Sequence, residues 1–162
     1  MALHPKSTVL MTGATDGTVC GANYVTGESF GRIGKHQDEV ESVALSEELQ
    51  IGVSGGIDSN LILYDLKSLQ VRKKIAPTEY GGYTRLMFSS FQIKDKEGNL
   101  SIMLYAASTL GSFFVIDVRS GEVVREYRGH EAPINWFEEA KFRKWIVTAG
   151  DDNQCNIFKL DV

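Results

Sequence analysis

A short turn pattern recurs along the chain at nearly constant spacing, and this repetition constrains the fold more than any other feature. The pattern occurs at four aligned positions: Asp16-Gly17, Asp58-Ser59, Leu110-Gly111 and Asp152-Asn153. The first and last intervals are both 42 residues, and the middle interval is ten residues longer. A polar insertion at 92–99 accounts for the excess, because a surface loop can lengthen at little thermodynamic cost. The sequence therefore predicts an array of about four related units.

Each unit contains four short strand-like runs separated by turn residues. None of the runs is long and periodic enough to force a helix. We expect the innermost strands at 40–45, 83–88 and 134–137. A period near 42 residues with four strands per unit matches the blade of a β-propeller better than a helical solenoid. The sequence thus predicts an all-β fold of about four blades, with approximate bounds 1–36, 37–78, 79–129 and 130–162.

The last unit, Gly121 to Leu160, resembles a WD repeat. In WD repeats a His, a strand Ser or Thr, a turn Asp and a strand Trp form a buried hydrogen-bond relay. A buried carboxylate is tolerated only when its partners satisfy it, so a blade that loses one member gains by losing the others. The resemblance implies relay residues in three blades: His130, Thr148 and Asp152 in the last, His36, Ser54 and Asp58 in the second, and Thr12 and Asp16 in the first.

Every blade departs from the WD pattern at the Trp position of the relay. The residues found there are Phe158 in the last blade, Tyr64 in the second, Ile116 in the third and Ala22 in the first. The third blade also has Ala106 and Leu110 in place of the hydroxyl and the carboxylate, and it has no aligned His. His36 and His130 lie far from any cluster of Cys, His or paired carboxylates in the sequence. The structural relay is therefore favoured over a general base or a metal ligand, and we expect no cofactor.

The two ends of the chain fall at particular places in this repeat. The chain begins within or at the end of an innermost strand and stops just after the third strand of the last blade. WD rings usually have seven or eight blades. We therefore expect about half of such a ring, with the last blade lacking its outer strand and with apolar faces and strand edges exposed. Self-association, or pairing with a separate N-terminal half, would complete the ring.

Composition narrows the class of partner. The formal net charge is −4, whereas nucleic-acid-binding domains usually carry a basic face. We therefore expect a protein or peptide partner and no direct contact with nucleic acid. No apolar run approaches the length of a membrane span, and no signal-peptide pattern is present. Cys20 and Cys155 lie in separate strand-like segments, which favours reduced thiols in a cytoplasmic protein, with the nucleus as an alternative.

An acidic stretch, Asp38 to Glu41, is the charge cluster that looks most functional. Glu39 and Glu41 lie near the start of an innermost strand, beside the channel mouth at the top face where WD rings usually bind peptides. Further candidates at this face are the last-blade counterpart of Glu41 and the residues just before each turn: Asn135, Thr15, Ile57, Thr109 and Asp151. Carboxylates gathered there would attract a basic partner and make binding sensitive to salt. The alternative is an ordinary solvated rim.

A competing reading comes from Val53 to Ser59, which spells the SGGxDS loop of ATP pyrophosphatases. In such a loop, backbone N–H groups and hydroxyls hold a pyrophosphate between a strand and a helix. The ten-residue frame around this stretch appears three more times at blade spacing, which the enzyme interpretation does not explain. Parallel strands joined by crossover helices are also hard to find in the rest of the sequence. The blade turn is therefore favoured, and we expect no enzyme.

A nearer resemblance rests on several short phrases. They are Ala2-Leu3-His4-Pro5-Lys6, Thr12-Gly13 with Asp16-Gly17, Asp38-Glu39-Val40-Glu41-Ser42-Val43, Ile62-Leu63-Tyr64-Asp65-Leu66, Val118-Arg119-Ser120-Gly121 and Tyr127-Arg128-Gly129-His130. Together they resemble the C-terminal half of the angio-associated migratory cell protein family. Its fungal members are dedicated chaperones that capture a basic large-subunit ribosomal protein during its synthesis. The resemblance implies a protein-binding module with such a client, and the alternative is a WD-repeat scaffold in another complex.

Overall fold

The computed structural model describes residues 1–3, 8–76, 81–140 and 143–160, so His4-Pro5-Lys6 of the family phrase lies outside the described residues. In the described part, all regular elements are β-strands, and they form antiparallel sheets. This confirms the predicted all-β fold. Among these residues there is also no helix long and apolar enough to cross a membrane.

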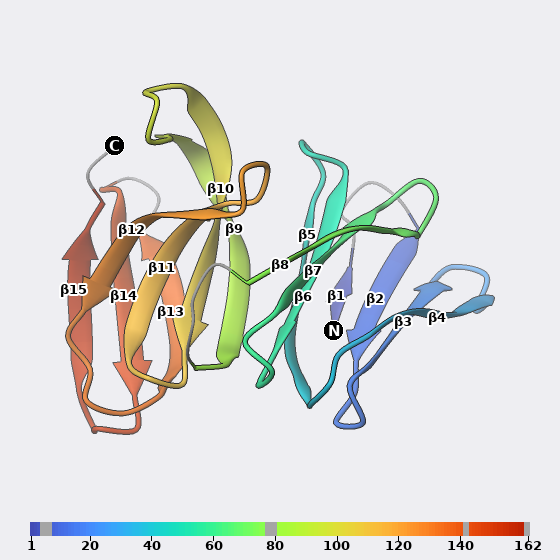
Figure 1. Cartoon of the computed structure of the whole chain (residues 1–162), viewed down its shortest axis with the longest axis horizontal. Coiled ribbons are helices and arrows are strands. Elements are labelled where there is room, and N and C mark those ends of the chain that lie inside the picture. The colour runs from blue at the N-terminus through green and yellow to red at the C-terminus, as the bar shows by residue number, and fades with distance from the viewer. Residues whose placement is uncertain (4–7, 77–80, 141–142, 161–162) are drawn as a thin grey trace.

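Four sheets follow one another along the chain, and strands adjacent in sequence pair within each sheet (Figure 1). The first two sheets contain β1 (Ala2–Leu3), β2 (Val9–Gly13), β3 (Thr18–Asn23) and β4 (Ser29–Lys35), then β5 (Val40–Ser46), β6 (Ile51–Gly56), β7 (Leu61–Asp65) and β8 (Val71–Ile75). The third contains β9 (Tyr83–Lys94), β10 (Leu100–Ser108), β11 (Ser112–Asp117) and β12 (Glu122–Arg128). The fourth has three strands in the described chain: β13 (Ile134–Ala140), β14 (Trp145–Gly150) and β15 (Cys155–Lys159).

The recurring turn joins the second and third strands of every sheet, and one residue in it has the same unusual backbone conformation each time. The residues and their φ angles are Gly17 (83°), Ser59 (62°), Gly111 (79°) and Asn153 (61°). Glycine and asparagine tolerate this left-handed region best, which explains the residue found at three of the four positions. Position 111 requires glycine for a second reason, because a Cβ there would lie 2.3 Å from the carbonyl oxygen of His130.

Apolar side chains fill the spaces between consecutive sheets. Met11, Val19 and Tyr64 belong to the first of three clusters, and Val53, Leu104 and Ile116 belong to the second. The third cluster, between the last two sheets, includes Tyr105, Phe113 and Phe137. The two middle sheets therefore contribute side chains to a cluster on each side, whereas the first and fourth sheets contribute to one cluster each. The first strands of successive sheets also pack together.

The polar insertion differs from the expected loop. Gln92, Ile93 and Lys94 continue β9, and only 95–99 form the turn before β10. Ile93 is buried in the third cluster, which gives the extension its own apolar contact. The long β9–β10 hairpin stands out at the upper edge of Figure 1.

Candidate functional site

The relay residues of the second sheet form one continuous hydrogen-bonded chain. His36 Nδ1 lies 2.9 Å from Asp58 Oδ1, and His36 Nε2 lies 2.7 Å from Ser54 Oγ. Ser54 Oγ lies 3.0 Å from the hydroxyl of Tyr64, which occupies the Trp position. When His36 Nδ1–H donates to Asp58, Nε2 accepts from Ser54, and Ser54 in turn accepts from Tyr64. The phenol therefore extends a relay that would otherwise end at the serine.

Burial and hydrogen bonding act in opposite directions on the carboxylate of this relay. Burial alone would raise the pKa of Asp58, but hydrogen bonds from the Gln37 backbone N–H, from His36 and from the Asn60 backbone N–H outweigh it and lower the pKa. At the other end of the chain, burial raises the pKa of Tyr64 to about 12, although its bond to Ser54 opposes the shift. Asp58 is therefore held ionised and Tyr64 protonated at neutral pH.

The fourth sheet has a shorter relay. His130 Nδ1 lies 2.9 Å from Asp152 Oδ1, and His130 Nε2 lies 2.8 Å from Thr148 Oγ1. The His130 hydrogen bond is the largest influence on Asp152 and lowers its pKa. Phe158 occupies the Trp position and has no hydroxyl with which to extend the chain.

The first and third sheets lack this arrangement. Asp16 accepts from the backbone N–H and the hydroxyl of Thr18, at 2.8 and 2.9 Å, and its side chain is 68% exposed. The structure therefore does not bring Asp16 into a buried relay with Thr12. In the third sheet Ala106 and Ile116 are buried, whereas Leu110 is exposed.

The predicted binding residues lie along one edge of the sheets, which we call the top face. This edge carries the turns 57–60, 109–111 and 151–154 and the starts of β5, β9 and β13. In the orientation of Figure 1 the top face points downward. Backbone N–H groups of the turns donate to carbonyl groups before the inner strands, as in Ile57 to Glu39 at 3.0 Å, Thr109 to Gly82 at 3.0 Å and Asp151 to Pro133 at 2.9 Å. The same contact therefore recurs in three sheets.

A β-bulge near the start of each of these inner strands sets the direction of one side chain. The register skips Glu41 in β5, Thr84 in β9 and Asn135 in β13. Glu41 and Asn135 were predicted as counterparts, and both are exposed. The sequence reasoning missed Thr84, which its place in the strand alignment could have revealed. A bulge leaves its extra residue unpaired and re-aims its side chain, so the exposed Glu41 and Asn135 are suited to contact a ligand. Thr84 is half-buried, and its hydroxyl donates to the carbonyl oxygen of Ile134.

Some of the predicted residues make contacts within the chain. Thr109 Oγ1 accepts from the backbone N–H of Gly82 at 2.9 Å, so its hydroxyl is partly committed. The side-chain amide of Asn135 donates to the carboxylate of Asp151, which brings these two candidates together. Thr15, in the first sheet, is exposed.

The top face combines negative charge with exposed apolar groups. Its exposed carboxylate residues are Asp38, Glu39, Glu41, Glu131 and Asp151, and its exposed apolar residues are Ile57, Leu110 and Trp136. Arg85 does not neutralise these carboxylates. Its guanidinium carbon lies 3.3 Å from the centroid of the Trp136 ring, and its NH2 pairs with Glu138 at 3.2 Å. The face therefore offers carboxylates to a basic ligand.

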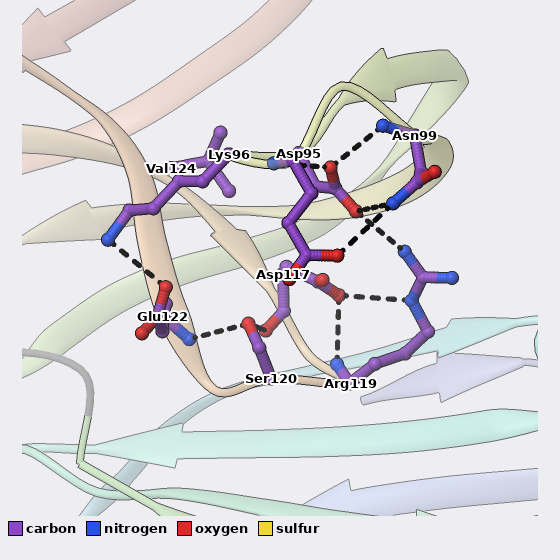
Figure 2. A pocket seen from close by; sticks show the side chains of 9 residues that line it. Asp95, Lys96, Asn99, Asp117, Arg119, Ser120, Glu122 and Val124 are labelled. Carbon is purple, nitrogen blue, oxygen red and sulfur yellow. Dashed lines mark hydrogen bonds and ion pairs between the residues drawn. The ribbon is translucent and has the colours of Figure 1, made fainter.

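A pocket at the opposite end of the third sheet is occupied by its own charges (Figure 2). Arg119 lies between two carboxylates, with Nε 3.3 Å from Asp117 Oδ1 and NH2 3.6 Å from Asp95 Oδ2. Lys96 pairs with Glu122 at 3.1 Å across the rim. These side chains stabilise the β9–β10 and β11–β12 turns against each other, and the pocket, of about 340 Å³, carries none of the predicted site residues.

The SGGxDS stretch does not form a pyrophosphate cradle. Its first half is strand β6, and Asn60 leads directly into the antiparallel strand β7 where the enzyme would have a helix. Ser54 and Asp58 are engaged in the His36 relay. In the described chain, moreover, no group of three or more His, Cys, Asp or Glu residues is placed to hold a metal ion. The local geometry is that of a blade turn.

Comparison with known proteins agrees with this geometry. The family model of the WD domain, G-beta repeat, matches residues 121–159, the segment that contains the His130 relay. Residues 121–159 therefore form a WD repeat. The crystal structure of Saccharomyces cerevisiae Sqt1 matches it with a TM-score of 0.80 over 99% of this chain and 44% of that chain, at 21% sequence identity. Four blades of a WD-repeat β-propeller are therefore the fold.

Two curated relatives extend the comparison. A WD repeat-containing protein of Schizosaccharomyces pombe is 27% identical over 155 residues, which cover 96% of this chain and 36% of the relative. Angio-associated migratory cell protein of dog is 22% identical over 173 residues, which cover 98% of this chain and 37% of the relative. The chain thus spans a little over a third of the length of these relatives, and it resembles the predicted family.

Proposed function

We propose that this WD-repeat chain is a non-enzymatic module that binds a basic protein segment at its top face. The observation that carries the proposal is the position of Glu39 and Glu41, both exposed at the start of β5, with Glu41 held out on a β-bulge. Asp151 continues the negative charge onto the fourth sheet. Several exposed carboxylates on one face accelerate the encounter with a cationic partner and bias its orientation.

The client we propose is a basic large-subunit ribosomal protein, which this chain would chaperone in the cytoplasm during ribosome biogenesis. Resemblance to the angio-associated migratory cell protein family and the fold shared with Sqt1 support this choice. The negative net charge of the chain, −4, supports it too, because it complements a cationic client. Shielding such a client before assembly requires binding and no chemistry.

The test is a titration against N-terminal segments of the large-subunit ribosomal proteins, each beside a scrambled segment of equal charge. Fluorescence anisotropy at stepped NaCl concentrations would report the affinity. We expect one segment to bind more tightly than its scrambled control, and its affinity to fall with salt because exposed charges are screened within about 10 Å at 0.1 M. Equal binding of every segment and its control would reject a dedicated client, and an unchanged affinity across the salt range would reject the acidic site.

A further inference from the structure

The missing relay of the third blade places an apolar side chain on the top face. In the second and fourth blades the turn position holds Asp58 and Asp152, and each turns inward to a histidine. In the third blade the same position holds Leu110, which has no such partner and is 61% exposed. An exposed aliphatic side chain on this turn offers apolar area that a ligand can remove from water.

A second exposed apolar residue lies across a two-glycine segment from this leucine. The segment Gly81-Gly82 runs between the two blades, and a Cβ added at Gly81 would lie 2.7 Å from Leu110 Cγ. A Cβ added at Gly82 would lie 2.5 Å from the Cα of Ile57, whose side chain is 38% exposed. Ile57 and Leu110 therefore flank one segment without side chains, at the boundary of the second and third blades.

Carboxylates border this apolar pair. The backbone N–H of Ile57 donates to the carbonyl oxygen of Glu39 at 3.0 Å, so these two residues are direct neighbours across the strand start. Glu41 follows on the bulge of the same strand. A ligand that covers Ile57 and Leu110 therefore also lies beside the carboxylates of Glu39 and Glu41. This arrangement suits a ligand that has a cationic side chain next to an aliphatic one.

We propose that Ile57 and Leu110 form an apolar subsite, bordered by Glu39 and Glu41, that takes a large aliphatic side chain of a basic peptide. This inference rests on the proposed function and specifies the ligand further. An aliphatic side chain that is desolvated on binding adds affinity through burial of apolar area, and it distinguishes basic segments that carry the same charge. Leu110, which stands where the other blades have the relay Asp, would thereby take part in ligand recognition.

The experiment compares two synthetic peptides of Lys and Gly that differ at one central position, which is Leu in one and Ser in the other. We expect the chain to bind the Leu peptide about tenfold more tightly, which corresponds to about 1.4 kcal/mol and to partial burial of one leucine. The variant Leu110→Ser should bind both peptides equally, with the affinity for the Ser peptide unchanged. Ile57→Thr should reduce the preference in the same direction.

The matched control is Leu100→Ser, because Leu100 is 57% exposed at the opposite end of the same blade. This variant should keep the full preference for the Leu peptide, and circular dichroism should show that each variant is folded. Equal affinity of the unaltered chain for the two peptides, or a preference that survives Leu110→Ser, overturns the subsite while leaving the acidic site intact. Binding of neither peptide above an uncharged Gly/Ser peptide overturns the acidic site and the subsite together.

Discussion

Replacing Asp58 by Asn tests how much the relay of the second blade stabilises the fold. The Asp58 carboxylate accepts from His36 Nδ1, from the Gln37 backbone N–H at 3.0 Å and from the Asn60 backbone N–H at 3.1 Å. Gln37 and Asn60 approach different oxygens of the carboxylate. An amide has only one oxygen, so in Asp58→Asn one of these two N–H groups faces an NH2 donor whichever way the amide turns.

The expected loss follows from these contacts. The variant loses one hydrogen bond to a charged group, and its remaining bond to His36 becomes a neutral one. Hydrogen bonds to charged groups contribute about 1.5–3 kcal/mol and neutral ones about 1 kcal/mol. We therefore expect Asp58→Asn to lower the free energy of unfolding by about 2–3 kcal/mol, which leaves a typical domain folded. Urea denaturation followed by circular dichroism would measure the loss.

Dependence on pH gives the same prediction a second readout. The folded-state pKa of Asp58 lies below its ordinary value of 3.8, so its stabilising contribution is complete above that value and disappears as pH falls through the lower folded-state pKa. The difference between the unaltered chain and Asp58→Asn should therefore shrink below about pH 4. Asp16→Asn is the matched control, because Asp16 holds the same turn position while exposed and without a histidine. Equal losses for the two variants would refute the relay argument.

Two further substitutions test neighbouring parts of the blades by urea denaturation. Tyr64→Phe should lower the free energy of unfolding by about 1 kcal/mol, because the buried ring loses only its hydrogen bond to Ser54. An unchanged free energy of unfolding would show that the phenol hydroxyl does not contribute to the relay. Gly111→Ala should cost clearly more than Gly27→Ala. Both have positive φ, at 79° and 74°, but only the Cβ at Gly111 would strike the carbonyl oxygen of His130, while that at Gly27 would meet nothing within 4 Å. Equal costs would contradict the clash.

The sequence was sufficient for features that depend on local chemistry. The turn at Asp16-Gly17 could be predicted because glycine favours the left-handed backbone that this turn needs, and apolar runs lie on both sides of it. The His36–Ser54–Asp58 hydrogen bonds followed from a resemblance that fixes their spacing along one blade. Short-range patterns of this kind survive in any tertiary context that buries the same face.

Features that depend on a partner strand could not be predicted in the same way. The bulge at Thr84 exists because β9 and β10 change register between Tyr83 and Arg85, and no pattern within β9 alone specifies it. The stack of Arg85 on Trp136 joins inner strands of two blades and needs their relative placement. The polar run 92–99 predicted a loop after Phe91. In the structure β9 continues to Lys94, and Ile93 is the buried side chain within this extension.

The measurement that most directly tests a basic-segment site on the top face compares two charge-reversed chains. Glu39→Lys with Glu41→Lys alters the top face, and Glu28→Lys with Glu97→Lys alters exposed residues in turns at the opposite end of the blades. Each pair adds four positive charges, so both bring the formal net charge from −4 to zero. Titration with the basic Leu-containing peptide at low salt should show a loss of at least tenfold for the top-face pair and little change for the other. An equal loss for both pairs, or no loss for the top-face pair, would contradict the site.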